Sequence, residues 1–225
     1  MPSQICRTLG AIQTDMLKHY FILTLIILPF VSICQDTSSN YRNQLKLSGL
    51  RAINILNPGI EISYERLGGN NFSTQLSAGI ATNIFGRPFD KLRGYNIGLE
   101  EKYFCKKSSK ISKYISLALS YNDIKYQEKT SGNDPITNLP IVDTFTIARK
   151  TISLAFNYGI QFYKRHFVLD INLGAGLKYR TVKHHDRTLE YKGPREPFDL
   201  HRAANVERNG FAFHLPINVQ LGYRF

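Results

Sequence analysis

The sequence predicts an all-β fold, an eight-stranded antiparallel up-and-down transmembrane β-barrel. Three observations predict it: unbroken apolar–polar alternation in the last fifteen residues, the same alternation in earlier segments, and an alternation of short and long connections between the segments. A strand that crosses a membrane in a barrel needs apolar side chains toward lipid and polar side chains toward the lumen, over about ten residues.

The final segment, residues 211–225, shows this alternation best. Successive residues of a strand point to opposite faces. One face is wholly apolar, with Phe211, Phe213, Leu215, Ile217, Val219, Leu221, Tyr223 and Phe225. The opposite face is polar or small and carries Arg224, which does not suit a dry core. Pro216 lacks the N–H that a closed ladder uses, so we expect a bulge or local break there.

The N-terminal region resembles an export signal. Residues 21–31 (FILTLIILPFV) follow Lys18 and precede Ser32-Ile33-Cys34, a small-x-small pattern before a cleavage site. Eleven apolar residues fall short of the roughly 20 that a spanning helix needs, although an anchor remains an alternative. Acylation of Cys34 is a second alternative. The expected organisation is a signal peptide at 1–34, with a possible start at Met16, a short segment at 35–43 and the barrel at 44–225.

Composition hides this fold, because barrel strands dilute their apolar residues with polar ones. The 225 residues are 43% hydrophobic, with a mean hydropathy of −0.23. Loss of Arg7, Asp15 and Lys18 with the signal changes the net charge from +12 to +11. Such a chain favours anionic neighbours, and export excludes nucleic acid in favour of membrane phosphates. Cys105 is the one cysteine left after cleavage, so no internal disulfide forms.

Apolar and polar residues alternate in eight segments of the chain. The first, residues 44–54, is the poorest, because its phase slips between Leu47 and Leu50. The fourth places Glu101 on the apolar face, so we expect a shallow position or a bulge that turns it inward. The other expected strands are residues 59–67, 72–84, 95–104, 113–125, 144–163, 167–180 and 211–225.

The connections form a second signal. Short links follow the second, fourth and sixth segments, at 68–71, 106–112 and 164–166. Long links follow the third, fifth and seventh, at 86–94, 127–143 and 181–210. Short turns at one end and long loops at the other are typical of a barrel with both termini in the periplasm. The link around Asn57-Pro58-Gly59 would be an unusually short outer loop.

The chain resembles the small outer-membrane β-barrel proteins of the outer membrane protein A barrel type. The resemblance covers about residues 44–225 and lies in the run PGIEISYERLGGNNFS from Pro58 and in the C-terminal pattern of Leu221, Tyr223 and Phe225. It implies the outer membrane of a Gram-negative cell, and a C-terminal signal that barrel assembly machinery recognises. It supplies no catalytic residues, cofactor or metal.

The polar face predicts a charged lumen. An eight-stranded barrel is just wide enough to be filled by side chains, so we expect pairing across it as a buried ionic network, with an ion or proton path as the alternative. The expected members are Glu61, Glu65, Glu100, Lys102, Asp170, Lys178, Arg180 and Arg224.

Other candidate sites lie near the last long loop. His184, His185, Asp186 and His201 lack the spacing of a metal site, and a solvated loop is the expectation. His214 is the candidate for a lipid-modifying enzyme, but no Gly-x-Ser-x-Gly elbow occurs. A candidate anion-binding loop, with a mobile solvated loop as the alternative, contains Lys183, Arg187, Lys192, Arg195, Arg202 and Arg208.

The predicted function is therefore structural, adhesive or surface-binding, without catalysis. The expected partners are outer-membrane lipids, lipopolysaccharide and barrel assembly machinery, and the expected state is a monomer. Two alternatives stay open: a barrel enzyme that modifies lipid A, and a soluble exported lipid-binding β-barrel. The soluble barrel would have the faces reversed, because period 2 shows that two faces differ without showing which looks outward.

Overall fold

The computed structural model describes residues 41–53, 57–68, 71–83, 90–106, 108, 110–133, 140–187, 189 and 205–225. The expected signal peptide and residues 35–40 lie outside these ranges. Within them, no helix combines the length and apolarity needed to cross a membrane.

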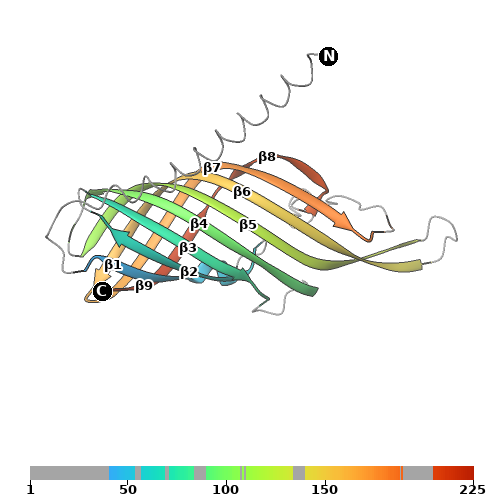
Figure 1. Ribbon diagram of the computed structural model, residues 1–225, viewed down its shortest axis with the longest axis horizontal. Coiled ribbons are helices and arrows are strands. Elements are labelled where there is room, and N and C mark those ends of the chain that lie inside the picture. Colours follow the sequence, from blue (N-terminus) through green and yellow to red (C-terminus); the bar gives the residue numbers. More distant parts are fainter. Residues whose placement is uncertain are drawn as a thin grey trace, which may run out of the picture.

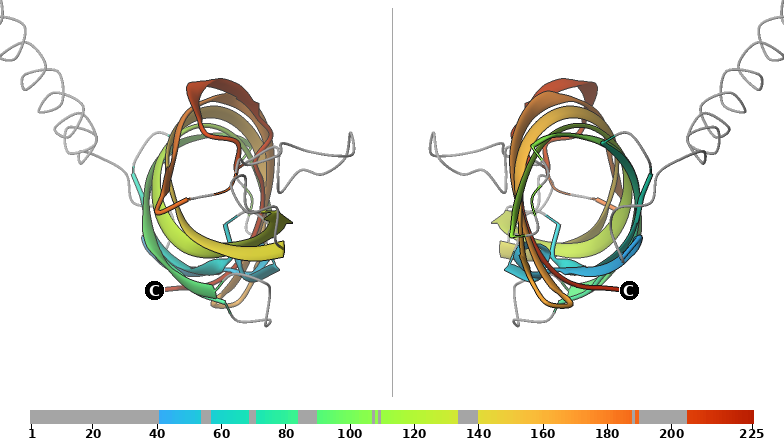
Figure 2. Two further views of the ribbon diagram at one scale, coloured as in Figure 1. Left: turned by 90° about the vertical axis from the view of Figure 1, so that its right-hand side faces the viewer. Right: turned by 90° about the vertical axis from the view of Figure 1, so that its left-hand side faces the viewer.

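The strands form one antiparallel meander that closes on itself (Figure 1). They are β1 Asn43–Ser48, β2 Gly59–Leu67, β3 Phe72–Ala81, β4 Asp90–Lys106, β5 Ile111–Asn133, β6 Pro140–Lys164, β7 Phe167–His185, β8 Arg208–His214 and β9 Ile217–Arg224. Each strand from β1 to β7 pairs with the one that follows it, and β1 also pairs with β9. Because β8 and β9 both pair with β7, they are two halves of one strand. The predicted eight-stranded barrel is confirmed, and Figure 2 shows the ring along its axis.

The interruption between β8 and β9 lies at Pro216, where a bulge or break was expected. Gly176 pairs with His214 on one side of it and Leu173 pairs with Ile217 on the other. The two strands advance by the same number of residues between these pairs, so the register does not shift. The amide of Gly174 still donates to the carbonyl of Pro216 at 2.9 Å. The break is local because proline removes a donor and leaves its acceptor in place.

The first predicted strand is too long. β1 ends at Ser48, and the chain then forms one helical turn, α2 Gly49–Ile53, where the apolar phase slips. The Arg51 guanidinium in this turn donates to Glu61 Oε2 at 2.8 Å and to Asn122 Oδ1 at 2.9 Å. Both partners face the lumen, so the Arg51 side chain points into the barrel. The residues of α2 therefore do not continue β1 in the barrel wall.

The short turns and both ends of the described chain lie at one end of the barrel, which we call the turn end; the opposite end is the loop end. At the turn end β6 and β7 are joined by Arg165 and His166 alone, with Arg165 at φ 55°. The expected strand at 59–67 is confirmed residue for residue. The strand expected at 72–84 ends at Ala81, and Ile84 lies outside the described residues.

Several strands continue past their expected ends at the loop end. β4 begins at Asp90, β7 runs to His185, and β5 and β6 remain paired out to Asn133 and Pro140. Much of the predicted loop at 127–143 is therefore a two-stranded arm, which projects beyond the other strands (Figure 1).

The apolar face changes sides where these extensions begin. Below this level the outward residues of β5 to β7 include Tyr121, Ile152 and Tyr179, which are direct neighbours across the strands. Above it most buried, inward positions are apolar, namely Ile124, Tyr126, Phe145, Ile147 and Val182, and the charged Arg149 and Asp143 are buried among them. The same level on three strands thus separates an exterior suited to lipid from an exterior suited to water. The inversion also explains why the predicted strands ended too early. The sequence prediction followed apolar residues on one face only, and above this level the apolar residues lie on the other face.

Below this level the exterior is an apolar belt bounded by aromatic rings. Neighbouring rings lie 6.0 Å apart for Tyr95–Tyr121 and 5.1 Å apart for Tyr179–Phe211 at the loop-end edge. Ring pairs also occur at the turn-end edge, between Phe72 and Tyr103, and between Phe167 and Tyr223. At roughly 3.3 Å per residue and a tilt of about 45°, the belt on β7 is about 28 Å high, close to the hydrocarbon core of a bilayer.

The orientation of the two faces argues against a soluble lipid-binding barrel. Such a barrel would hold its apolar residues inside, whereas here they are exposed outside and polar groups fill the lumen. Glu101 stays on the outer face near the turn end, without a register shift at its position, and accepts a 2.8 Å hydrogen bond from Thr74 Oγ1. This is the shallow position expected of an outward carboxylate.

Candidate functional site

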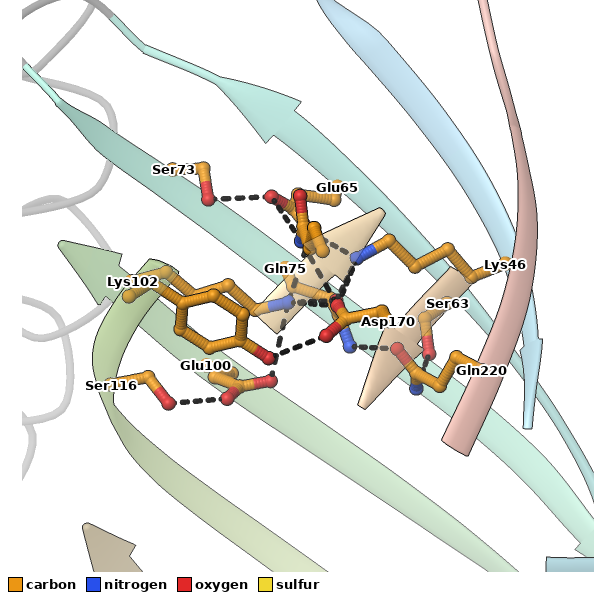
Figure 3. A network of polar contacts seen from close by, with 12 residues as sticks. Lys46, Ser63, Glu65, Ser73, Gln75, Glu100, Lys102, Ser116, Asp170 and Gln220 are labelled. Atoms are coloured by element: carbon orange, nitrogen blue, oxygen red, sulfur yellow. Dashed lines mark hydrogen bonds and ion pairs between the residues drawn. The ribbon is translucent and has the colours of Figure 1, made fainter. Parts of the chain in front are cut away.

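The turn-end half of the lumen holds an ionic cluster of Lys46, Glu65, Lys102 and Asp170 (Figure 3). The Lys102 ammonium lies 3.0 Å from Glu65 Oε2 and 2.8 Å from Asp170 Oδ2. The Lys46 ammonium contacts the same two carboxylates. These four side chains have no exposed area. Because two cations face two carboxylates, the cluster is neutral as a whole.

Neutral polar groups complete the hydrogen bonds of the cluster. Gln75 Oε1 accepts from Lys102 at 2.8 Å, Gln161 Nε2 donates to Asp170 Oδ2 at 2.9 Å, and Ser73 Oγ donates to Glu65 Oε1 at 2.7 Å. The Tyr114 hydroxyl donates to Asp170 Oδ1 at 2.7 Å. Buried charges are tolerated when their remaining hydrogen-bonding positions are satisfied in this way. At this level the lumen is filled by side chains.

A glycine makes room for the Tyr114 ring. Gly159 is the direct cross-strand partner of Tyr114, and a Cβ built on it would lie 2.1 Å from Tyr114 Cζ. The ring can therefore lie flat against the wall of β6 and reach Asp170 only because position 159 has no side chain.

A cavity of about 470 Å³ lies above the cluster, toward the loop end. Its charged lining consists of Arg51, Arg149, Lys178 and Arg180 with Glu61 and Glu100, a surplus of two positive charges. His214 and uncharged Ser, Thr, Asn and Gln side chains form much of the rest. Cavities of this size accept small organic ligands.

The two carboxylates of the cavity already have nearby partners. Glu61 forms an ion pair with Arg51 at 2.8 Å and accepts from Asn96. Glu100 accepts from Ser116 Oγ at 2.5 Å and lies 3.8 Å from the Lys102 ammonium.

The structure places the eight predicted lumen charges at four different sites. Glu65, Glu100, Lys102 and Asp170 meet in or beside the ionic cluster, and Glu61 pairs with Arg51. Lys178 and Arg180 line the cavity instead. Arg224 lies at the turn-end rim, with its guanidinium carbon 4.9 Å from the Tyr41 ring centroid and 4.8 Å from that of Tyr163. Sequence reasoning missed Lys46, although the alternation of Gln44, Lys46 and Ser48 with Leu45 and Leu47 contains the signal.

The predicted anion-binding loop is only partly described, because Lys192, Arg195 and Arg202 lie outside the described residues. The described members do not form one surface. Lys183 is exposed on the outer wall, whereas Arg208 pairs with inward-facing Val182. Arg187 is held within the link after β7, where its Nε donates to the carbonyl of Leu189 at 2.6 Å.

The described histidines at the loop end, His184 and His185, do not take part in a metal site formed by described residues. Among the described residues no three His, Cys, Asp or Glu side chains come close enough to hold a metal ion, and His201 lies outside them. Burial lowers the pKa of His184, so its ring is neutral near pH 7. Its Nδ1 lies 2.7 Å from Arg187 Nη1, which suits a neutral ring accepting from the guanidinium.

His214, the candidate for a lipid-modifying site, lines the lumen cavity and pairs with Gly176 across the strands. Its imidazole therefore looks into the lumen, away from the lipid-facing wall. The residues of the C-terminal assembly pattern, Leu221, Tyr223 and Phe225, are all exposed on the outer face.

Two solved structures align with most of the chain. The N-terminal β-barrel domain of Pseudomonas aeruginosa OprF has 12% identity and a TM-score of 0.40, covering 82% of this chain and 98% of the OprF domain. A major outer membrane protein from Thermus thermophilus has 14% identity and a TM-score of 0.43, covering 81% of this chain and 99% of its own. No family model and no curated protein matches the sequence.

Proposed function

We propose that this chain is an integral β-barrel of the outer membrane of a Gram-negative cell, with a structural and surface-binding role. The apolar belt carries the proposal. A closed barrel with a polar lumen and an exterior of exposed Leu, Ile and Phe between two aromatic edges is not stable in water as a monomer. Export by a signal at residues 1–34 and assembly through Leu221, Tyr223 and Phe225 belong to the same proposal.

Cations on the outer wall support a surface-binding role. Arg93, Lys125 and Lys183 face outward at one level, because Arg93 pairs with Lys125 and both Lys125 and Lys183 pair with Ala148. Lys150 lies one outward position closer to the belt. These side chains stand just above the loop-end aromatic edge, the height at which lipid phosphates meet a barrel. Lipopolysaccharide phosphates are the proposed partner, bound by the wall together with the basic loop.

Heat-dependent gel mobility tests the location and the fold together. We expect the protein in the outer-membrane fraction, migrating differently in SDS before and after boiling, because a closed barrel keeps its hydrogen-bonded ladder until heated. Recovery in the soluble periplasm without a mobility shift would contradict the proposal.

The wall cations can be tested separately. The double variant Lys125→Gln/Lys183→Gln should bind lipopolysaccharide about 30-fold more weakly, because each cation near an anionic surface contributes about 1 kcal/mol. Binding of the purified, detergent-solubilised protein to lipopolysaccharide is the measurement. The matched control, Lys110→Gln/Lys164→Gln, removes two exposed charges at the turn end and should change little. Equal weakening in both variants, or a loss that 0.5 M salt does not abolish, would contradict a role for the wall cations.

A further inference from the structure

We propose that the lumen cavity is a binding site for a small phosphate-bearing anion that also carries hydroxyl groups. This site is distinct from the outer-wall cations, because it lies inside the barrel. Three observations lead to it: the position of the basic side chains, the prior engagement of the carboxylates, and the polar remainder of the lining.

The basic side chains are gathered on one wall. Lys178 and Arg180 are successive inward residues of β7 and therefore lie about 7 Å apart along the strand. Arg149 pairs with Val182, one inward position beyond Arg180, and His214 pairs with Gly176, one inward position before Lys178. Adjacent strands β6, β7 and β8 thus present a continuous basic surface to the cavity.

The acids of the cavity stand on other strands and are bound to other groups. Glu61 lies on β2 and pairs with Arg51, while Glu100 lies on β4 beside Lys102. Among the described residues no carboxylate lies within 4.0 Å of the Lys178 ammonium. Arg149 already donates to Asn57 Oδ1 at 2.8 Å and to Asn205 Oδ1 at 3.2 Å, so the anion is expected beside the Lys178 ammonium.

The rest of the lining determines the chemical class of the ligand. Ser77, Ser120, Ser153, Asn172 and Asn218 offer hydroxyl and amide groups, and residues of these kinds outnumber the apolar residues of the lining. A lining of this kind hydrogen-bonds a polyhydroxylated molecule, whereas Arg and Lys hold its phosphate. About 470 Å³ is enough for a sugar phosphate and far more than inorganic phosphate needs. The floor of the cavity is the filled ionic cluster, which closes it toward the turn end.

Titration of the whole protein in uncharged detergent micelles tests this site. Glucose 6-phosphate, inorganic phosphate and glucose are added at constant ionic strength, and binding is followed by calorimetry and by NMR shifts of the β7 amides. We expect saturable binding of glucose 6-phosphate, weaker binding of inorganic phosphate and none of glucose. Lys178→Gln should weaken glucose 6-phosphate at least tenfold, and Lys178→Gln/Arg180→Gln should abolish saturation.

The control variant is Lys164→Gln, which removes one exposed charge at the turn end and should bind like the parent. Heat-dependent mobility of every variant shows that the barrel is folded. Unsaturable binding, or equal loss in Lys178→Gln and Lys164→Gln, would overturn the site and indicate general attraction to a basic protein. These outcomes are independent of outer-membrane location, since a folded membrane barrel that binds no anion remains one.

Discussion

Replacement of Asp170 by asparagine is expected to lower the free energy of unfolding by about 3–5 kcal/mol. The substitution keeps the size of the side chain but leaves Lys46 and Lys102 with Glu65 as their one remaining carboxylate in the ionic cluster. The new amide can also turn its NH₂ group, a hydrogen-bond donor, toward the ammonium group of Lys46 or Lys102, which are donors themselves. Uncompensated positive charge then remains in a part of the lumen where the side chains have no exposed area.

The measurement is a urea titration of the barrel in lipid vesicles or detergent, followed by circular dichroism and by the heat-dependent gel shift. Asp123→Asn is the matched control. Asp123 lies 3.7 Å from Lys150, whose side chain is largely exposed, and such pairs contribute about 0–1 kcal/mol. If the two variants lose equal stability, the ionic cluster is hydrated and does not act as a buried network.

A second substitution separates charge imbalance from lost packing. Lys102→Met combined with Asp170→Asn leaves Lys46 with Glu65, a balanced pair. We expect the double variant to be at least about 1 kcal/mol more stable than the sum of the single effects, because contacting charges couple. Additive effects would show that the cluster stabilises the barrel through shape alone.

The sequence alone was enough to identify the inner face but not the partners on it. Period 2 placed Glu65, Lys102 and Asp170 inside, because each falls on the polar face of its segment, opposite the face that carries Tyr64, Tyr103 and Leu169. Which charges meet depends on how far each strand is staggered against the next, and that stagger is set by the whole ring. For this reason Lys178 and Arg180, predicted within the same network, line the cavity on another part of the wall.

Two other departures have local physical causes. Lys46 was overlooked because the first strand stops at Ser48, and the residues of α2 obscured its short pattern. The arm of β5 and β6 was predicted as a loop because its apolar residues change faces above Tyr121. In water the inner face of an arm must be apolar and the outer face polar, so one continuous strand carries two opposite patterns.

This change of faces makes the last prediction sharp. Phe156→Arg should destabilise the barrel in lipid vesicles by about 2–4 kcal/mol, because Phe156 points outward near the middle of the apolar belt and an arginine there meets hydrocarbon. Val142→Arg should change the stability by less than about 0.5 kcal/mol. The two residues lie on the same strand and face, and their exposed fractions are alike, 71% for Phe156 and 66% for Val142.

The two variants therefore have the same strand, the same face and a similar exposed fraction. They differ in the surroundings of the side chain, which is lipid at position 156 and water at position 142. Urea unfolding in lipid vesicles gives the stability change of both variants under one condition. The aromatic edges fix the tilt and depth of the barrel in the bilayer in both cases. If both variants lost the same large amount of stability, the arm would lie in lipid as well. If neither variant lost stability, the apolar belt would lie in water. A large penalty at 156 with none at 142 would place the membrane surface between these two positions, an interval that contains the level of Tyr121 and Ile124, where the apolar face changes sides.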